Sequence, residues 1–280
     1  MFKSGTFISF LIALFGCVSC SEQVDLPTVS VLGHGGGGFT AIQNPHPANS
    51  RNSIERAIFL EGADGVELDI QVTADNKFVL YHDNRLETST NSSGFISDYT
   101  LSDLQSVSYR GGTDQSTKYP LLSLDEAIQI LSDAGRNLTL SLNIQPQPEI
   151  EDQESYRFTI KLMLRSLRFK NTINMLVESP DRELLKALTS SQPWPPFISY
   201  YYDASASATN VEFAKDLQLK GLVSNYLNED QSSVQTAKEA GLEMVLYGLK
   251  IRKDIVNALK LEPDMIQTDN VPLSLDILGR

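Results

Sequence analysis

The sequence predicts an α/β protein, a (β/α)8 TIM-type barrel with a small inserted subdomain. From residue 29 to residue 280, short apolar runs alternate with segments of helical periodicity. This alternation is typical of a parallel sheet that closes into a barrel. No linker interrupts it, and 41% of the 280 residues are hydrophobic, which is enough for one large core. We therefore predict one barrel domain over residues 29–280.

Nine runs have the composition of strands, which is one more than a barrel of eight strands can hold. They lie at 29–35, 65–70, 78–83, 138–145, 174–179, 197–202, 221–226, 243–249 and 265–271. The helical segments between them are 53–61, 124–133, 158–167, 182–188, 211–219, 234–240 and 255–259. One of the nine runs must therefore lie outside the barrel.

The stretch GADGVELDIQVTADNKFVLYHD, at 62–83, breaks the alternation. No helix fits between Asp69 and Phe78, and Ala74-Asp75-Asn76-Lys77 has the chemistry of a turn. We expect the chain to return in an extended conformation, which brings Glu67 and His82 to the same rim of the barrel. The polar residues that follow, at about 84–122, form a longer excursion than barrel connections need, and we predict an inserted subdomain there.

Residues 1–20 have the features of a targeting segment. One cation, Lys3, precedes an apolar run at 7–15 that is too short to span a membrane. The segment resembles a bacterial lipoprotein signal, in which a cysteine after the cleavage point is acylated. Cys20 is the preferred lipidation site and Cys17 is the alternative. An ordinary cleaved signal peptide is the other interpretation.

Export follows from either interpretation. We expect a short tether at 21–28 and a domain in the bacterial cell envelope, attached to the membrane only through an N-terminal lipid anchor. The net charge of −12 argues against nucleic acid as a partner. The chain has only two cysteines, both in the targeting segment, so the exported domain has no disulfide and no thiolate metal site.

Two carboxylates fall on one face of the second predicted strand. Glu67 and Asp69 are two residues apart, so their side chains point to the same side. Carboxylates at this separation repel each other unless a cation lies between them. Oxygen ligands favour Ca²⁺ or Mg²⁺, and we predict a divalent cation here.

Two of the three histidines end strand-like runs at the same predicted rim. His34 ends the first run and His82 ends the third, where Asp83 follows it. Two imidazoles beside a bound phosphate can serve as general base and general acid near neutral pH. Asp83 either orients a neighbouring group or caps the strand end.

These residues resemble the glycerophosphodiester phosphodiesterase family. The motifs that carry the resemblance are HG at 34–35, NS at 52–53, the stretch 62–83, LETSTNSSGFISDYTLSDL at 86–104, PLLSLDEAI at 120–128 and PDMIQTDNVPLSL at 263–275. The resemblance implies a barrel with the insertion described above, His34 and His82 as the acid/base pair, and a cation held by Glu67 and Asp69. The implied reaction releases an alcohol and glycerol 3-phosphate from a glycerophosphodiester.

Three positions depart from the family pattern. Gly35 stands where the family has arginine, and Asn143 and Gln145 stand where it has glutamate and lysine. One anion and two cations are thus replaced by neutral groups. The amide carbonyl of Asn143 can still ligate a cation, and Gln145 can still donate a hydrogen bond to a phosphate oxygen. Charge-assisted hydrogen bonds are roughly twice as strong as neutral ones, so a weaker grip on phosphate is expected.

Four further features bear on the site. The glycines at 35–38 either present backbone N–H groups to an anion, as a compensation for the lost charges, or form a loop that no longer holds phosphate. Tyr247 is a candidate for lining the substrate pocket. His46 and Glu178 are candidates for replacing lost groups.

Two functions remain open at this stage. The first is metal-dependent hydrolysis of glycerophosphodiesters by the two histidines. The second is a catalytically impaired family member that binds a phosphodiester or a related small ligand, or that hydrolyses a different diester. The retained histidine pair favours hydrolysis.

Overall fold

The computed structural model describes residues 29–280, except for 41–43, 114–115, 169 and 191–196. The predicted signal peptide at 1–20 and tether at 21–28, with Cys17 and Cys20, lie outside the described residues. Among the helices of the described part, none has both the length and the apolar character needed to cross a membrane.

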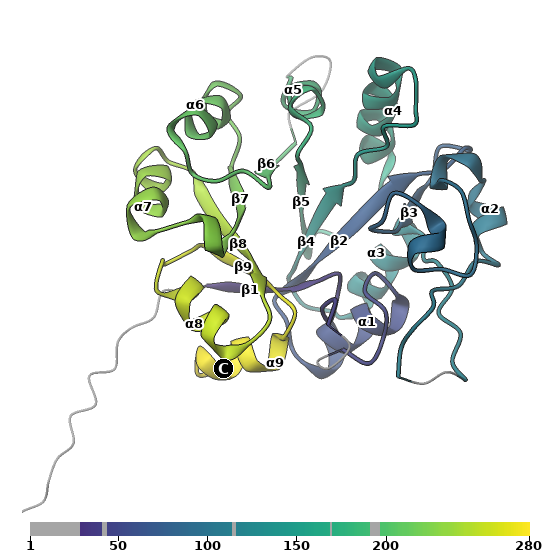
Figure 1. Cartoon of the computed structure of the whole chain (residues 1–280), viewed down its shortest axis with the longest axis horizontal. Coiled ribbons are helices and arrows are strands. Elements are labelled where there is room, and N and C mark those ends of the chain that lie inside the picture. The colour runs from purple at the N-terminus through teal and green to yellow at the C-terminus, as the bar shows by residue number, and fades with distance from the viewer. Residues whose placement is uncertain (1–28, 41–43, 114–115, 169, 191–196) are drawn as a thin grey trace, which may run out of the picture.

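Eight parallel strands form a closed barrel, which confirms the predicted fold class. The bounds of the barrel strands are β1 Ser30–His34, β2 Gly65–Val72, β4 Leu138–Ile144, β5 Ile173–Ser179, β6 Ser199–Tyr202, β7 Gly221–Asn225, β8 Glu243–Leu249 and β9 Met265–Thr268. Each strand pairs with the next along the chain, and β1 pairs with both β2 and β9, which closes the sheet. Figure 1 shows the strands at the centre with helices around them.

The run predicted at 78–83 is the one of the nine that lies outside the barrel. This strand, β3 (Phe78–Leu80), pairs only with β2 and runs antiparallel to it, with Ile70 opposite Leu80. The turn between them contains Asn76, which has a positive φ of 56°. The chain therefore returns extended, as the sequence predicts, but it runs back along β2, so that Tyr81 N donates to Asp69 O and His82 follows directly.

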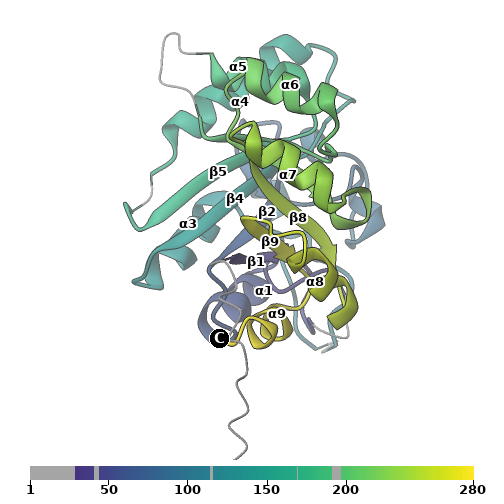
Figure 2. The same ribbon diagram turned by 90° about the vertical axis from the view of Figure 1, so that its left-hand side faces the viewer.

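Helices cover the outside of the barrel, apart from the short helix at 101–104, which belongs to the inserted segment (Figures 1 and 2). Their bounds are α1 Arg51–Glu55, α2 Leu101–Leu104, α3 Leu124–Asp133, α4 Gln153–Ser166, α5 Arg182–Thr189, α6 Ala208–Asp216, α7 Gln231–Glu239, α8 Arg252–Leu259 and α9 Val271–Ile277. The first predicted helix begins two residues early, at Arg51, and continues after α1 as a π-helical turn over Arg56–Leu60. Ser123 caps α3 by accepting a hydrogen bond from the backbone of Glu126, which satisfies one of the free N–H groups of the first turn.

The two faces of the barrel strands separate apolar from polar side chains. Leu68 and Ile70 of β2 point outward into the main core between strands and helices. Glu67 and Asp69 alternate with them and therefore point into the barrel. The part of the barrel interior nearer the amino-terminal ends of the strands is apolar and includes Tyr200. A polar layer thus lies in the barrel, toward the carboxyl ends of its strands.

Residues 84–122 form a small unit beside the barrel with a core of its own. Its buried side chains include Leu86, Ile96, Leu104 and Tyr119, and they pack against Val79 and Tyr81 from the β3 segment. The phenol of Tyr109 donates to the carbonyl oxygen of Leu80 at 2.9 Å. This unit is therefore anchored on the segment that ends at His82.

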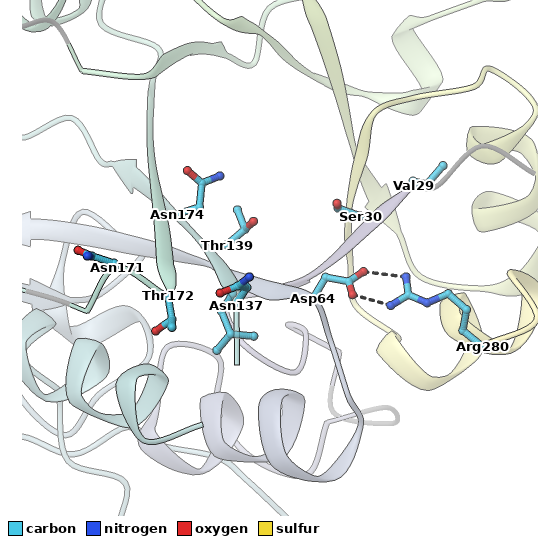
Figure 3. Close-up of a pocket in the computed structure, with 10 residues that line it drawn as sticks. Val29, Ser30, Asp64, Asn137, Thr139, Asn171, Thr172, Asn174 and Arg280 are labelled. Atoms are coloured by element: carbon cyan, nitrogen blue, oxygen red, sulfur yellow. Dashed lines mark hydrogen bonds and ion pairs between the residues drawn. The ribbon is translucent and has the colours of Figure 1, made fainter. Parts of the chain in front are cut away.

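At the opposite end of the barrel, an ion pair joins the last residue, Arg280, to Asp64, which precedes β2. The guanidinium of Arg280 makes two contacts with the Asp64 carboxylate, at 2.8 and 2.5 Å, as Figure 3 shows. Asp64 Oδ2 also accepts a hydrogen bond from Val31 N at 2.9 Å. These residues border a cavity of about 650 Å³ at the amino-terminal ends of β1, β4 and β5.

We expect Asp64→Ala to destabilise the protein more than Arg280→Ala. Arg280 is 41% exposed at its side chain, so its loss removes a solvent-screened pair and costs below about 1 kcal/mol. Asp64→Ala also leaves the Val31 N–H without its acceptor, and we expect a cost of about 1–3 kcal/mol. Urea unfolding of both variants measures the difference. Equal losses would contradict the prediction.

Candidate active site

His34 ends β1 and is fixed by a carboxylate from the last strand of the barrel. Its Nδ1 lies 2.8 Å from Asp269 Oδ1, and its Nε2 lies 4.0 Å from Glu67 Oε2. Burial raises the pKa of Asp269, but the hydrogen bond and charge of His34, together with hydrogen bonds from Phe39 and Thr40, outweigh this and hold the pKa below its ordinary value. Asp269 is therefore ionised and can only accept, so Nδ1 of His34 carries the proton and Nε2 is free to accept one.

His82 follows β3 and has a carboxylate partner of its own. Its Nδ1 lies 3.1 Å from Asp83 Oδ1, and Asp83 Oδ2 accepts from the Ser89 hydroxyl at 2.7 Å. The hydrogen bond with Asp83 raises the pKa of His82, although partial burial opposes the shift. Each imidazole thus has one nitrogen tied to a carboxylate and the other available for a proton transfer.

Glu67 and Asp69 are fully buried, and their charges lie close together. Both side chains have 0% exposure. Burial raises the pKa of Glu67 well above its ordinary value, and the neighbouring charges of Asp69 and Glu178 add to the rise. Hydrogen bonds from Gly35 N and from the Asn143 side chain only partly offset these effects. In the part of the chain that the structure describes, no lysine or arginine forms an ion pair with either carboxylate.

Asp69 is held by two neutral amides. Asn49 Nδ2 and Gln145 Nε2 each donate to a different oxygen of the carboxylate, both at 2.7 Å. Asn49 also accepts from the backbone N–H of Asp69 at 3.1 Å, and it adopts a positive φ of 62°. The side-chain amide of Gln145, which was predicted to contact phosphate, therefore donates a hydrogen bond to Asp69.

Two buried oxygen atoms at this point have no hydrogen-bond partner. They are Glu67 Oε1 and Asn143 Oδ1. Asn143 also lowers the pKa of Glu67 and so partly offsets the effect of burial. Unpaired buried acceptors are costly, and hard cations prefer such oxygen ligands. The donor set therefore fits a cation of the Ca²⁺ or Mg²⁺ type.

Carboxylates and imidazoles alone do not complete such a site. Across the described residues, no three His, Cys, Asp or Glu side chains are grouped closely enough to hold a metal ion. Glu178 reaches the same layer from β5, but its two oxygens accept from Gln267 Nε2 at 2.9 and 3.1 Å across the barrel. A cation here would depend on the neutral oxygen of Asn143 beside the carboxylates.

The glycine-rich loop directs its amides into the protein. Gly35 N donates to Glu67 Oε2 at 3.0 Å and Gly37 N donates to Ser53 Oγ at 2.7 Å. Gly36 N and Gly38 N donate to the carbonyl oxygens of Gly33 and His34. These amides are thus engaged within the protein, whereas the sequence left open both a loop that presents them to a bound anion and a loop that no longer holds phosphate. The loop is fixed by its own hydrogen bonds.

An aromatic ring from this loop contacts both histidines. The centroid of Phe39 lies 4.5 Å from that of His34 and 5.2 Å from that of His82. The side chains predicted to be the acid/base pair are thus brought to one place, on either side of one ring. Glu67, Asp69, Asn143 and Gln145 lie at the same rim.

Other predicted residues lie farther from this group. Tyr247 stacks on Tyr202 at 5.5 Å between centroids and donates to Asp203 Oδ1 at 2.6 Å. His46 Nδ1 lies 3.2 Å from the hydroxyl of Tyr119, in the inserted unit. His46 therefore has a partner away from His34 and His82.

Three residues of the site escape prediction from sequence. Asp269 belongs to the TDN motif at 268–270, which reads equally well as a barrel closure. Asn49 and Phe39 lie in the irregular segment after β1, where no periodicity indicates which side chains turn inward. For Asp269, the motif TDN is the only sequence feature that points to a role in the site.

Fold and site together define a barrel protein with two carboxylate-paired histidines beside buried carboxylates. The chain belongs to the glycerophosphoryl diester phosphodiesterase family, whose model matches residues 41–273. The matched range begins after His34 and the glycine-rich loop.

Relatives of known name agree with this assignment. A glycerophosphodiester phosphodiesterase of Caldanaerobacter subterraneus is 24% identical over 246 residues, which are 84% of this chain and 93% of the relative. A phosphodiesterase of Oleispira antarctica, solved with the product sn-glycerol-3-phosphate, superposes with a TM-score of 0.74 at 21% identity, covering 90% of this chain and 97% of the other. A glycerophosphodiester phosphodiesterase of Thermotoga maritima gives 0.66 at 23% identity, with 90% and 98% covered.

We expect Asp83→Asn to lower the pKa of His82, because the hydrogen bond with Asp83 is the main cause of its rise. The protonated ring is favoured in the folded state. Its contribution to stability is therefore complete below pH 6.5 and is lost as the pH rises through the raised pKa.

Proton NMR titration of the three histidine rings measures this effect. His46 serves as the internal control, because it lies in another loop and bonds to Tyr119. An unchanged His82 titration in Asp83→Asn would show that Asp83 does not set the protonation of the ring.

Proposed function

We propose that the protein hydrolyses glycerophosphodiesters to an alcohol and glycerol 3-phosphate, with His34 and His82 as the acid/base pair. One observation carries the proposal. In a chain of this family, two imidazoles each hydrogen-bond a carboxylate through Nδ1 and meet at the rim that holds Glu67 and Asp69. The product bound to the Oleispira relative supports the choice of glycerol 3-phosphate.

The two histidines differ in the role that their surroundings favour. His82 has a raised pKa, which favours its protonated form near neutral pH, so it protonates the oxygen of the leaving alcohol as the P–O bond breaks. His34 holds its Nδ1 proton toward Asp269, and its free Nε2 accepts the proton of the attacking water. The proton gained by His34 and the one lost by His82 balance over the cycle.

A divalent cation, Ca²⁺ or Mg²⁺, is part of this proposal. Glu67, Asp69 and the Asn143 carbonyl oxygen are the residues that would hold it, because two oxygens of this set have no other partner. When bound, the cation supplies positive charge to the phosphate oxygens and relieves the repulsion between the carboxylates. This matters here because Gly35 and Gln145 supply no charge.

The second candidate function is binding without hydrolysis, or hydrolysis of a different diester. The contact between Gln145 and Asp69 favours it, because the amide group that would grip phosphate is engaged elsewhere. The amides of the glycine-rich loop are engaged as well. The retention of two oriented imidazoles favours hydrolysis over binding alone, because a binding site has no need of paired proton-transfer groups.

We also propose that the domain acts in the bacterial cell envelope, on the exported side. The apolar run and the cysteines of residues 1–20 support export, and Cys20 is the proposed point of lipid attachment, with Cys17 as the alternative. Tyr247 and Asp83 are proposed to border the substrate, since both lie at carboxyl ends of strands around the site.

Release of glycerol 3-phosphate from a panel of glycerophosphodiesters tests the hydrolytic proposal. We expect activity with Ca²⁺ or Mg²⁺ and none with a chelator. His34→Ala and His82→Ala should each lower kcat by about 10²–10⁴-fold, the usual contribution of one acid or base. His46→Ala is the matched control and should keep full activity, because the ring of this third histidine bonds to Tyr119 of the inserted unit.

No release from any diester, by protein that is folded and binds the cation, would favour the binding-only alternative. Equal loss of activity in all three histidine variants would instead point to a general effect on the fold.

Thermal or urea unfolding with and without cation tests the proposed ligands. The raised pKa of Glu67 means that its charge costs stability above pH 4.5, so Glu67→Gln should stabilise the cation-free protein at neutral pH. Cation at 100 times its Kd should stabilise the unmodified protein by about 2.7 kcal/mol, and the Gln variant much less.

Glu55→Gln provides the control, because this residue is an exposed glutamate on α1 and should respond to cation as the unmodified protein does. A cation response that is absent from the unmodified protein, or equal in Glu67→Gln, would refute the assignment of ligands.

A further inference from the structure

Phe39 is the side chain shared by the two histidines. Its ring is tilted by 49° to His34 and stands nearly edge-on, at 64°, to His82. The residue is 41% exposed even though it packs on both imidazoles. A ligand that reaches both histidines therefore meets the open part of this ring.

The same carboxylate that orients His34 also holds Phe39. Asp269 Oδ1 accepts from Phe39 N at 3.2 Å, and Asp269 Oδ2 accepts from the hydroxyl of Thr40 at 3.1 Å. Gly38, with φ +103°, lies so close to this residue that an added Cβ would be 2.4 Å from Asp269 O. The ring is thus a fixed part of the site.

The position of the ring explains why residue 35 is glycine. A Cβ at Gly35 would lie 2.7 Å from Phe39 Cε2 and 2.7 Å from the Ala48 Cβ. Its φ of +57° further disfavours a side chain. A side chain at residue 35 and the ring of Phe39 in this position exclude each other. This chain therefore has an apolar aromatic surface where the resemblance predicts arginine.

Apart from the two histidines, the ionisable groups that border the ring are hydrogen-bond acceptors. Asp269, Glu67 and Asp83 border the two histidines, and in the described part of the chain no lysine or arginine side chain bonds to these carboxylates. A polyol gains no lysine or arginine donor here. A weakly hydrated apolar group gains contact with the exposed ring, at roughly 25 cal/mol per Å² of apolar surface removed from water.

We propose that Phe39 is a specificity-determining residue that favours phosphodiesters whose alcohol carries an apolar group over those with a second polyol. The inference rests on the proposed function for the reaction, while the binding preference stands on the contacts of Phe39 alone. It concerns the alcohol that leaves, which the histidines and carboxylates do not select.

Binding of two monoesters tests this preference apart from catalysis. Calorimetry with saturating Ca²⁺ or Mg²⁺ compares benzyl phosphate with glycerol 3-phosphate on the purified protein. Phe39→Ala should weaken benzyl phosphate binding about tenfold and change glycerol 3-phosphate binding less than about twofold. Phe39→Leu keeps an apolar side chain of similar size and should retain most of the preference. The ring-proton NMR signals of His34 and His82, referenced to His46, report whether the site is intact in each variant.

A kinetic comparison extends the test to the reaction. Glycerophosphodiesters with benzyl alcohol and with glycerol as the leaving group should differ in kcat/KM, and Phe39→Ala should reduce the benzyl-to-glycerol ratio about tenfold. If no diester is hydrolysed but benzyl phosphate binding depends on Phe39, the hydrolytic proposal fails and this one stands.

Three results would overturn the inference. The first is equal weakening of both ligands in Phe39→Ala. The second is tighter binding of both, which would show that the ring blocks the space. The third is absence of benzyl phosphate binding to the unmodified protein.

Discussion

Two carboxylates buried side by side in a closed barrel impose the constraint on which the rest of the site depends. Glu67 and Asp69 are inaccessible to solvent, and Glu178 adds a third buried carboxylate to the layer. Repulsion and desolvation both oppose their charges. Amide side chains donate hydrogen bonds to two of these carboxylates. Asn49 and Gln145 donate to Asp69, and Gln267 donates to Glu178. Glu67 alone keeps an oxygen without a partner.

The three departures from the family pattern acquire a common physical meaning in this setting. Asn143 and Gln145 replace charged groups, yet both engage the buried carboxylates, one through Glu67 and the other through Asp69. A neutral amide does not compensate a carboxylate as an ammonium group would, so burial and mutual repulsion raise the pKa of Glu67 and of Glu178. A bound divalent cation would relieve this repulsion. At Gly35 the reason is steric, because Phe39 takes the space.

The sequence predicts those parts of the protein that follow from periodicity. The alternation of strand and helix predicts the barrel, and the spacing of Glu67 and Asp69 predicts that they share a face. The extra strand is predicted in number, but its antiparallel direction depends on the turn at Asn76. The partners of the site are set by distant or irregular segments. Asp269 lies 235 residues from His34, and Asn49 reaches Asp69 from a loop. No local pattern encodes such contacts.

Asp269 makes the first loop and the last strand a single unit. Its carboxylate accepts from His34, from the backbone of Phe39 and from Thr40, and it follows β9, which pairs with β1. The closure of the barrel therefore determines where the imidazole points and where the aromatic ring lies. His82 is positioned separately, by β3 and the inserted unit, and it contacts the first group through Phe39. The relative position of the two histidines thus depends on how the inserted unit packs on the barrel, so changes in that packing can move one imidazole relative to the other without altering either residue.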